Sequence, residues 1–137
     1  MAYVSQERKA SLLPAIKAVL KKYGVKGTVA VRSYSTLTLT VKSGGIDFIG
    51  NCNHVCGSSH YHVSRGFRPI TQGYTDVNEY WYHEHFDGVA REFLKEVLEA
   101  MNVGNWDHSD IMSDYFNKGW YTRILIGKWD APYVLNV

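Results

Sequence analysis

The sequence predicts an α+β fold in which two helices pack on one face of a single sheet. Three observations predict this class: apolar residues recur at helical spacing within residues 5–23 and 86–101, strand-like alternation fills residues 28–42, and no internal repeat is present. A chain of 137 residues suits one domain, which buries roughly two thirds of the surface exposed on unfolding. We therefore expect a single domain over residues 1–137, in the order helix, antiparallel hairpin with a short third strand, long loop, helix and C-terminal strand.

The first predicted element is a helix from Ser5 to Tyr23. The Ser5 hydroxyl can cap the free amides at its start, and Gly24 can supply the left-handed residue that ends it. Its apolar face comprises Leu12, Leu13, Ile16, Val19, Leu20 and Tyr23. Pro14 removes a backbone donor inside this helix, so we expect a kink or a restart there.

The next segment predicts strands. Alternation with many β-branched residues over 28–42 indicates an antiparallel hairpin that turns near residues 33–35. Residues 46–49 are expected to form a short third strand, with Asp47 facing outward. Residues 50–78 are rich in Gly, Ser, His and Asn and lack sustained periodicity, which predicts a long, mobile or irregular loop. Such loops are uncommon in small domains unless they are functional or mobile, so this segment is a candidate site.

A second helix and a last strand complete the expected fold. The second helix has an apolar stripe formed by Phe86, Val89, Ala90, Phe93, Val97, Leu98 and Met101. The segment from Trp120 to Ile126 reads as a strand, and residues 131–137 indicate a last extended piece.

The net charge of +2 conceals a strong separation of charge along the chain. Residues 1–70 hold ten Lys or Arg against two acids, which gives +8, whereas residues 71–137 hold five against eleven, which gives −6. This pattern fits a basic face for an anionic partner, or two halves that neutralise each other within the fold. No apolar run approaches the roughly 18 residues that span a bilayer, and the charged N-terminus does not resemble a secretory signal. We expect no membrane association and a cytoplasmic location.

The stretch NCNHVCGSSHYH at residues 51–62 contains both cysteines and three of the six histidines. Four potential zinc ligands have the spacing C-x3-C-x3-H-x-H: Cys52, Cys56, His60 and His62. This spacing matches none of the well-attested zinc motifs, and a reducing cytosol explains free thiols. We expect no metal and no cofactor, with a zinc-stabilised loop as the alternative. A nucleophilic cysteine beside His54 or His60 would lack a recognisable third group to orient the base.

The remaining motif searches predict that the protein is not an enzyme. YWYHEHFD at residues 80–87 superficially resembles the helical metalloprotease motif, but Asp87 stands where that motif requires its second histidine. The phosphate-binding glycine motifs and the nucleophile elbow are absent from the sequence.

Basic residues are interleaved with aromatic residues in several segments. Lysine and arginine neutralise phosphates while aromatic rings stack on bases, although a solvated basic sheet face has the same pattern. The candidate residues for binding a protein partner or nucleic acid are Arg32, Tyr34, Lys42, Arg65, Phe67, Arg68, Tyr80, Trp81 and Tyr82.

Three segments also carry a family resemblance: PAIKAVLKKYGVKGTVAVRSYSTLTLTVKSGGIDFIGN at residues 14–51, SDYF at 113–116 and GKWDAPYVL at 127–135. They resemble an uncharacterised bacteriophage family, the twenty-ninth type of large polyvalent-protein-associated domain. These domains occur alone or within very large phage proteins thought to enter the host with the DNA and blunt its defences. The resemblance implies a stand-alone phage accessory protein acting in the bacterial cytoplasm, and it supplies no catalytic motif.

Together these observations favour a non-enzymatic phage accessory protein that binds and inhibits a host protein of defence or takeover. The alternative is a nucleic-acid-binding protein that uses the basic first half of the chain. A zinc-stabilised binding module is the second alternative.

Overall fold

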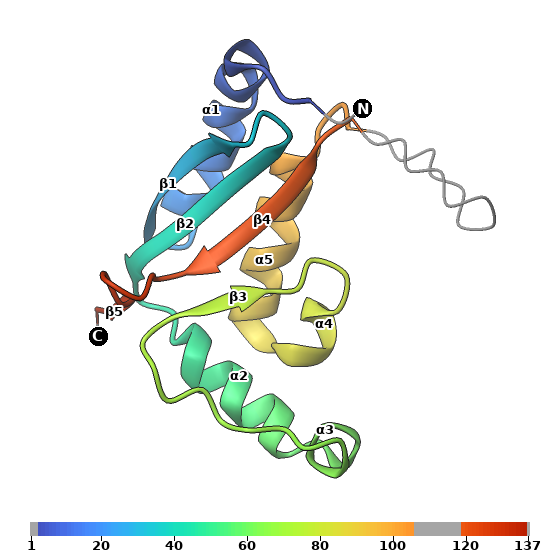
Figure 1. Ribbon diagram of the computed structural model, residues 1–137. Helices are drawn as coiled ribbons and strands as arrows, with labels where there is room; N and C mark the ends of the chain where they lie inside the picture. Colours follow the sequence, from blue (N-terminus) through green and yellow to red (C-terminus); the bar gives the residue numbers. More distant parts are fainter. Residues whose placement is uncertain (1–2, 106–118, 137) are drawn as a thin grey trace, which may run out of the picture.

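A computed structural model describes residues 3–105 and 119–136 and has the expected α+β architecture (Figure 1). Its helices are α1 (Gln6–Lys22), α2 (Phe48–Gly57), α3 (His60–Ser64), α4 (Tyr82–His85) and α5 (Gly88–Met101). Its strands are β1 (Val25–Arg32), β2 (Thr36–Gly44), β3 (Thr75–Val77), β4 (Tyr121–Ile126) and β5 (Val134–Leu135). Residues 113–116, which contribute to the family resemblance, lie outside the described residues.

The sheet is mixed and has the order β1-β2-β4-β3, with β5 beside the end of β2. Strands β1 and β2 form the predicted antiparallel hairpin, and β4 and β5 confirm the two expected C-terminal extended segments. Strand β4 pairs in parallel with β2 and antiparallel with β3. Two strands distant in the sequence therefore lie side by side at the centre of the sheet.

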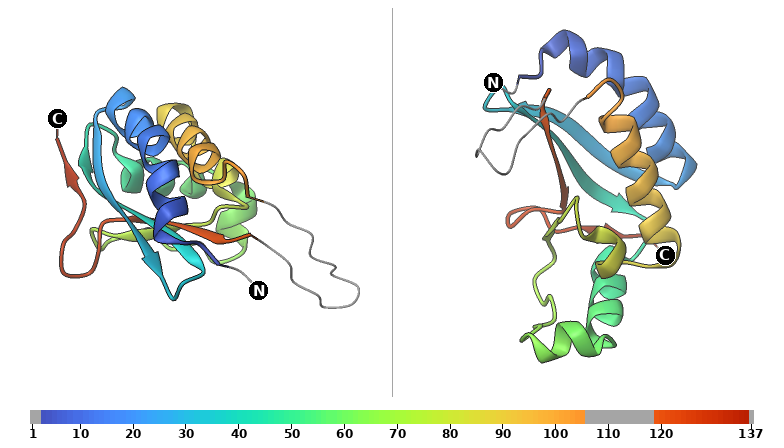
Figure 2. Two further views of the ribbon diagram at one scale, coloured as in Figure 1. Left: turned by 90° about the horizontal axis from the view of Figure 1, so that it is seen from above. Right: turned by 90° about the vertical axis from the view of Figure 1, so that its right-hand side faces the viewer.

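Helices α1 and α5 cover one face of this sheet, as predicted (Figure 2). Side chains from both helices and from the covered face of the strands form one hydrophobic core, which includes Ile16, Leu39, Phe48, Phe93, Val97 and Ile124. The two helices are also joined at their surface, where the Lys22 ammonium contacts the Glu96 carboxylate at 2.8 Å and the Tyr23 hydroxyl donates to the same carboxylate. The opposite face of the sheet carries neither α1 nor α5.

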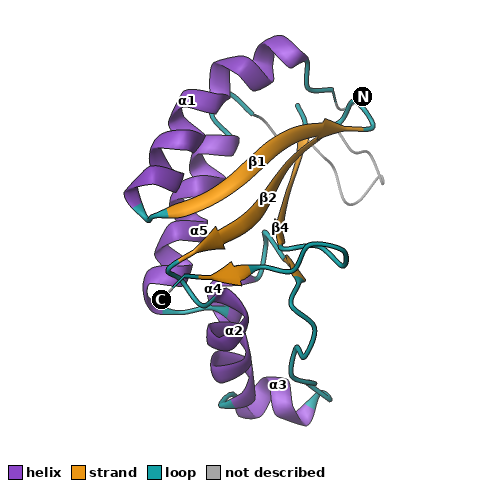
Figure 3. Cartoon of the chain, turned by 90° about the vertical axis from the view of Figure 1, so that its left-hand side faces the viewer, coloured by secondary structure: helices purple, strands orange, loops and turns teal. Residues whose placement is uncertain are grey.

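Local signals set the bounds of α1. The Ser5 hydroxyl accepts a hydrogen bond from the Arg8 amide at 2.9 Å, and the helix ends just before Gly24, whose φ is +65°. Both features confirm the prediction. The helix continues through Pro14 without a restart, and its course bends along its length (Figure 3).

The prediction of a third strand at residues 46–49 is wrong, because α2 begins at Phe48. The Asp47 side chain accepts a hydrogen bond from the Gly50 amide at 2.9 Å and caps this helix. Ile46 and Phe48 are buried as expected. A short apolar run is buried equally well at the end of a strand or the start of a helix, and the cap decides between them.

The prediction of a long, irregular loop over residues 50–78 is also wrong. The segment contains most of α2, all of α3 and strand β3. Helices α2, α3 and α4 form a helical lobe beyond the end of the sheet (Figure 3). Two reciprocal asparagine contacts hold it: Asn53 binds both backbone groups of Ile70 at 2.7 and 2.9 Å, and Asn51 binds the amide and carboxylate of Asp87 at 3.0 and 2.6 Å. Side chains that suggested a polar loop thus anchor regular structure.

Candidate functional site

The sheet face turned away from α1 and α5 is called the open face here, and it faces the reader in Figure 1. Strand register and side-chain alternation place three rows of residues across it. These rows are Arg32, Thr36 and Tyr121 at the hairpin end; Ala30, Thr38 and Arg123 in the middle; and Thr28, Thr40, Leu125 and Asp76 at the other end. Lys42 is exposed just beyond the third row, at the end of β2. The face therefore combines small hydroxyl residues with long cations.

The centre of the open face holds an unsatisfied hydroxyl. Thr38 is 3% exposed, and its Oγ1 atom has no hydrogen-bond partner among the described residues. An unpaired buried hydroxyl costs about 1–3 kcal/mol.

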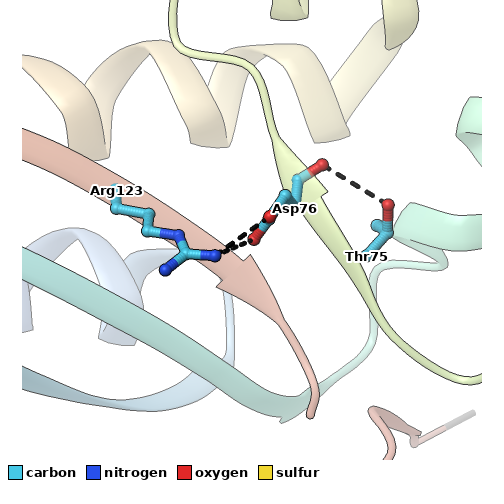
Figure 4. Close-up of polar contacts among 3 residues, drawn as sticks. All are labelled: Thr75, Asp76 and Arg123. Atoms are coloured by element: carbon cyan, nitrogen blue, oxygen red, sulfur yellow. Dashed lines mark hydrogen bonds and ion pairs between the residues drawn. The ribbon is translucent and has the colours of Figure 1, made fainter. Parts of the chain in front are cut away.

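Arg123 and Asp76 form the main polar contact on the face (Figure 4). The Arg123 Nη2 atom donates to both carboxylate oxygens of Asp76, at 3.1 and 3.2 Å, across the β4–β3 pair. Both side chains are more than half exposed, so the ion pair itself contributes little stability. Its chemical effect is to neutralise the only carboxylate in the three rows.

A pocket of about 430 Å³ opens beside this ion pair, and we call it the end pocket. Its lining includes Gln72, Tyr74, Asp76, Arg123, Lys128 and Trp129. Trp129 sits in a tight turn closed by two hydrogen bonds between the backbones of Lys128 and Ala131, at 2.9 and 3.2 Å. Its side chain is 78% exposed. A large aromatic ring held in solvent by an ordered turn is typical of a contact residue.

The hairpin tip presents a second exposed ring at the opposite end of the open face. Ser33 and Tyr34 have φ values of 52° and 62°, and Tyr34 is 79% exposed. Turns with two such residues usually use Asn-Gly, because a side chain in this conformation costs roughly 1–2 kcal/mol. The tip thus holds Tyr34 near Arg32 at a cost in strain.

The structure separates the predicted binding residues into two groups. Arg32, Tyr34 and Lys42 lie on or beside the open face, together with Tyr121 and Arg123, which the sequence analysis did not single out. The others belong to the helical lobe and its connections: Arg65, Phe67, Arg68, Tyr80, Trp81 and Tyr82. The positions of these residues in the sequence do not show which of them lie on the open face and which lie in the helical lobe.

The helical lobe has its own pocket, of about 460 Å³, lined by Val55, Ser59, Tyr61, His62, Trp81 and Glu84. The Arg65 guanidinium stacks on the Tyr61 ring at 3.7 Å from its centroid. Trp81 is 53% exposed, Phe67 and Tyr82 are half-buried, and Tyr82 packs against the core. Arg65 and Trp81 therefore have geometries suited to contact with a partner.

The two cysteines lie one turn apart on α2 with their thiols in contact. Burial raises the pKa of Cys52 to about 12, with a further rise from its neighbour, and burial also raises the pKa of Cys56. Both thiols are therefore protonated at neutral pH, whereas a cysteine nucleophile must be a thiolate. Within residues 3–105 and 119–136, no group of three or more His, Cys, Asp or Glu side chains is placed to hold a metal.

Chelation is expected to leave the protein unchanged. EDTA treatment of purified, untagged protein should not shift the Tm, and elemental analysis should find zinc well below one atom per chain, since the lobe is ordered by protein contacts. About one zinc per chain, removed with a fall in Tm, would contradict this. It would identify Cys52, Cys56, His60 and His62 as the ligands.

A histidine pair joins α3 to α4 in the lobe. The His62 and His85 rings lie 5.4 Å apart between centroids. Burial lowers the pKa of His85, nearby His62 and His83 lower it further, and Glu84 opposes them. The folded protein thus holds this proton less tightly than the unfolded chain, so stability is full above the ordinary pKa of about 6.5 and falls as the pH drops below it.

The His85→Gln variant is expected to lose less stability than the wild type on acidification from about pH 7 to about pH 5, because glutamine cannot titrate. Urea midpoints measured across this range give the comparison. His54→Gln, which replaces an exposed histidine on α2, is the control and should follow the wild type. If the urea midpoints of all three proteins fell equally with pH, protonation of His85 would not be the cause of the acid destabilisation.

Comparison with protein-family models, curated proteins and solved structures finds no match to this chain. None of the described helices is both long and apolar enough to cross a membrane.

Proposed function

We propose that this protein binds nucleic acid through the open face and carries out no chemistry on it. The observation that carries the proposal is the net positive charge of an uncovered sheet face: Arg32 and Lys42 stand on it, while the carboxylate in its three rows, Asp76, is neutralised by Arg123. Lys and Arg side chains bind phosphates and release counterions, which gives nucleic-acid affinity without sequence readout.

The shape of the face supports the same partner. Threonines occupy the middle strand of all three rows, so the centre is low between Arg32 on β1 and Arg123 on β4, and Lys42 stands at the end of the middle strand. Exposed tyrosines, Tyr34 and Tyr121, lie at the hairpin end, and Trp129 lies at the other. Aromatic rings and cations on a sheet are a common platform for stacking bases while phosphates are neutralised.

We further propose that the protein acts in the cytoplasm of a bacterial host. The resemblance of residues 14–51 and 127–135 to the phage domain family supports an accessory protein that acts in the cytoplasm of a bacterial host. Nucleic acid of phage or host would be available there.

Salt dependence is the test. Anisotropy titrations of a labelled oligonucleotide should show affinity that falls steeply with salt. The variant Arg32→Ala/Lys42→Ala should bind about tenfold or more weakly, with a salt slope lower by about 1 for each lost phosphate contact. The variant Lys17→Ala/Lys21→Ala removes the same charge from α1, on the covered side, and is the matched control. Undetectable or salt-independent binding would exclude the proposal.

As a second candidate, we propose that the helical lobe binds a host protein. Its exposed rings, Tyr61, Tyr80 and Trp81, together with Arg65, are of the residue types that dominate binding energy at protein interfaces. A protein enriched from bacterial lysate by the wild type should be lost with Trp81→Ala and kept with Arg32→Ala/Lys42→Ala. The reverse pattern, or no enrichment, would argue against this candidate.

A further inference from the structure

The end pocket and the open face form one continuous surface. Arg123, Leu125 and Asp76 belong to both, because they stand in the rows of the face and also line the pocket. A strand of nucleic acid that lies on the face and extends past the third row therefore reaches the pocket. The pocket is at the opposite end of the face from Tyr34 and Tyr121.

Two aromatic side chains, Tyr74 and Trp129, line this pocket. Trp129 is fixed by its closed turn, and Tyr74 follows Gly73, whose carbonyl accepts a hydrogen bond from the Tyr133 amide at 2.8 Å. The two residues are thus held by neighbouring backbone segments that are bonded to each other. Both residues are exposed, so their rings are available for a base to stack on.

The polar groups of the pocket suit a nucleobase and its phosphate. The Gln72 side-chain amide both donates and accepts hydrogen bonds, as the edges of bases require. Lys128 adds a cation at the rim, and the described residues give it no salt bridge. A volume of about 430 Å³ lies in the lower part of the roughly 300–1,000 Å³ range of small-ligand sites, so the pocket has room for a single base.

We propose that the end pocket holds a single unstacked base beside Tyr74 and Trp129, so that the protein prefers single-stranded to double-stranded nucleic acid. This inference rests on the proposed binding of nucleic acid by the open face. A base inside a duplex is paired and stacked on both sides and cannot enter a pocket unless it is extruded. A single strand presents its bases without that cost.

The test compares one oligonucleotide as a single strand and as a duplex, with wild type and variants, by fluorescence anisotropy. Wild type should bind the single strand more tightly. Trp129→Ala should weaken single-strand binding about tenfold, leave duplex binding unchanged and keep the salt slope, since it removes stacking but no charge. Trp129→Phe should retain most of the affinity. Val103→Ala, which removes an exposed apolar side chain just beyond the end of α5, is the control and should bind as wild type.

The outcomes separate this inference from the function on which it rests. Equal affinity for single strand and duplex, or an unchanged Trp129→Ala, would overturn the base pocket. If Arg32→Ala/Lys42→Ala still weakened binding in that case, the open face would keep its proposed function. Absence of binding to either form would overturn both.

Discussion

Replacing Phe48 with alanine is expected to lower the free energy of unfolding by about 3–5 kcal/mol. The Phe48 side chain is completely buried. Its ring centroid lies 6.5 Å from that of Phe86, 5.4 Å from that of Phe93 and 5.6 Å from that of Tyr133. The loss would be a large part of the roughly 5–15 kcal/mol that stabilises a typical domain.

Loss of the Phe48 ring should lower stability strongly because the aromatic rings around it belong to different parts of the fold. Phe48 opens α2, Phe86 lies between α4 and α5, and Tyr133 precedes β5. Tyr133 in turn donates from its hydroxyl to the Ile46 carbonyl at 2.6 Å, and burial raises its pKa to about 12. The aromatic cluster therefore joins the helical lobe, the main helical layer and the C-terminal segment.

Urea denaturation followed by circular dichroism measures the effect. Phe48→Leu should retain much of the stability, because it keeps apolar volume in the cluster. Val89→Ala is the control, since Val89 is half exposed on α5 although its spacing fits the apolar stripe; it should change stability by less than about 0.5 kcal/mol. A loss for Phe48→Ala no larger than this would contradict the core position of the ring.

The elements that could be predicted from the sequence are those with local signals. A capping serine, a run at helical spacing and a terminal glycine define α1, and alternation with β-branched residues defines the β1–β2 hairpin. Helix α5 follows in the same way from its apolar stripe. In each case the residues that decide the structure lie within one or two turns of each other, so that the pattern in the sequence contains the cause.

The errors fall where distant contacts decide. Residues 46–49 carry an apolar run too short to distinguish helix from strand, although Asp47 three positions before Gly50 is the signal that could have identified the helix start. Strand β3 has only three residues and forms because β4 offers an edge to pair with. The parallel pairing of β2 with β4 joins segments that no local pattern connects.

The same reasoning explains the candidate site. The interleaving of basic and aromatic residues predicts Arg32 and Lys42 as binding residues, and both also alternate with apolar residues in the hairpin. Tyr121 and Arg123 alternate with buried residues of β4 in the same way, so their outward direction was available in the sequence. The sequence does not show that they lie beside Arg32 and Lys42, because that position depends on the β2–β4 pairing. Trp129 and Tyr74 meet at one pocket only through the folded positions of two loops.

Replacing Gly127 with alanine is expected to lower the free energy of unfolding by about 2–5 kcal/mol. Gly127 has a φ of +70°, where a side chain costs roughly 1–2 kcal/mol. A Cβ atom there would also lie 2.5 Å from the Tyr133 amide nitrogen and 2.8 Å from the Gly73 carbonyl oxygen. Relieving such overlap adds roughly 1–3 kcal/mol. These two atoms form the hydrogen bond that joins the segments bearing Tyr74 and Trp129.

Gly66→Ala separates the two causes. Gly66 has a φ of +82°, and a Cβ atom added to it would meet nothing within 4 Å, so this variant should lose only the conformational part, about 1–2 kcal/mol. The difference between the two variants in urea denaturation then measures the close contact at Gly127. Folded Gly127→Ala should also lose preference for single strands, as Trp129→Ala does, because the pocket walls must separate to admit the methyl group. The prediction would be contradicted if both variants lost the same stability and Gly127→Ala kept its preference for single-stranded nucleic acid. In that case the backbone near Gly127 would move to accommodate the methyl group, and the Tyr133–Gly73 hydrogen bond would not set the shape of the pocket.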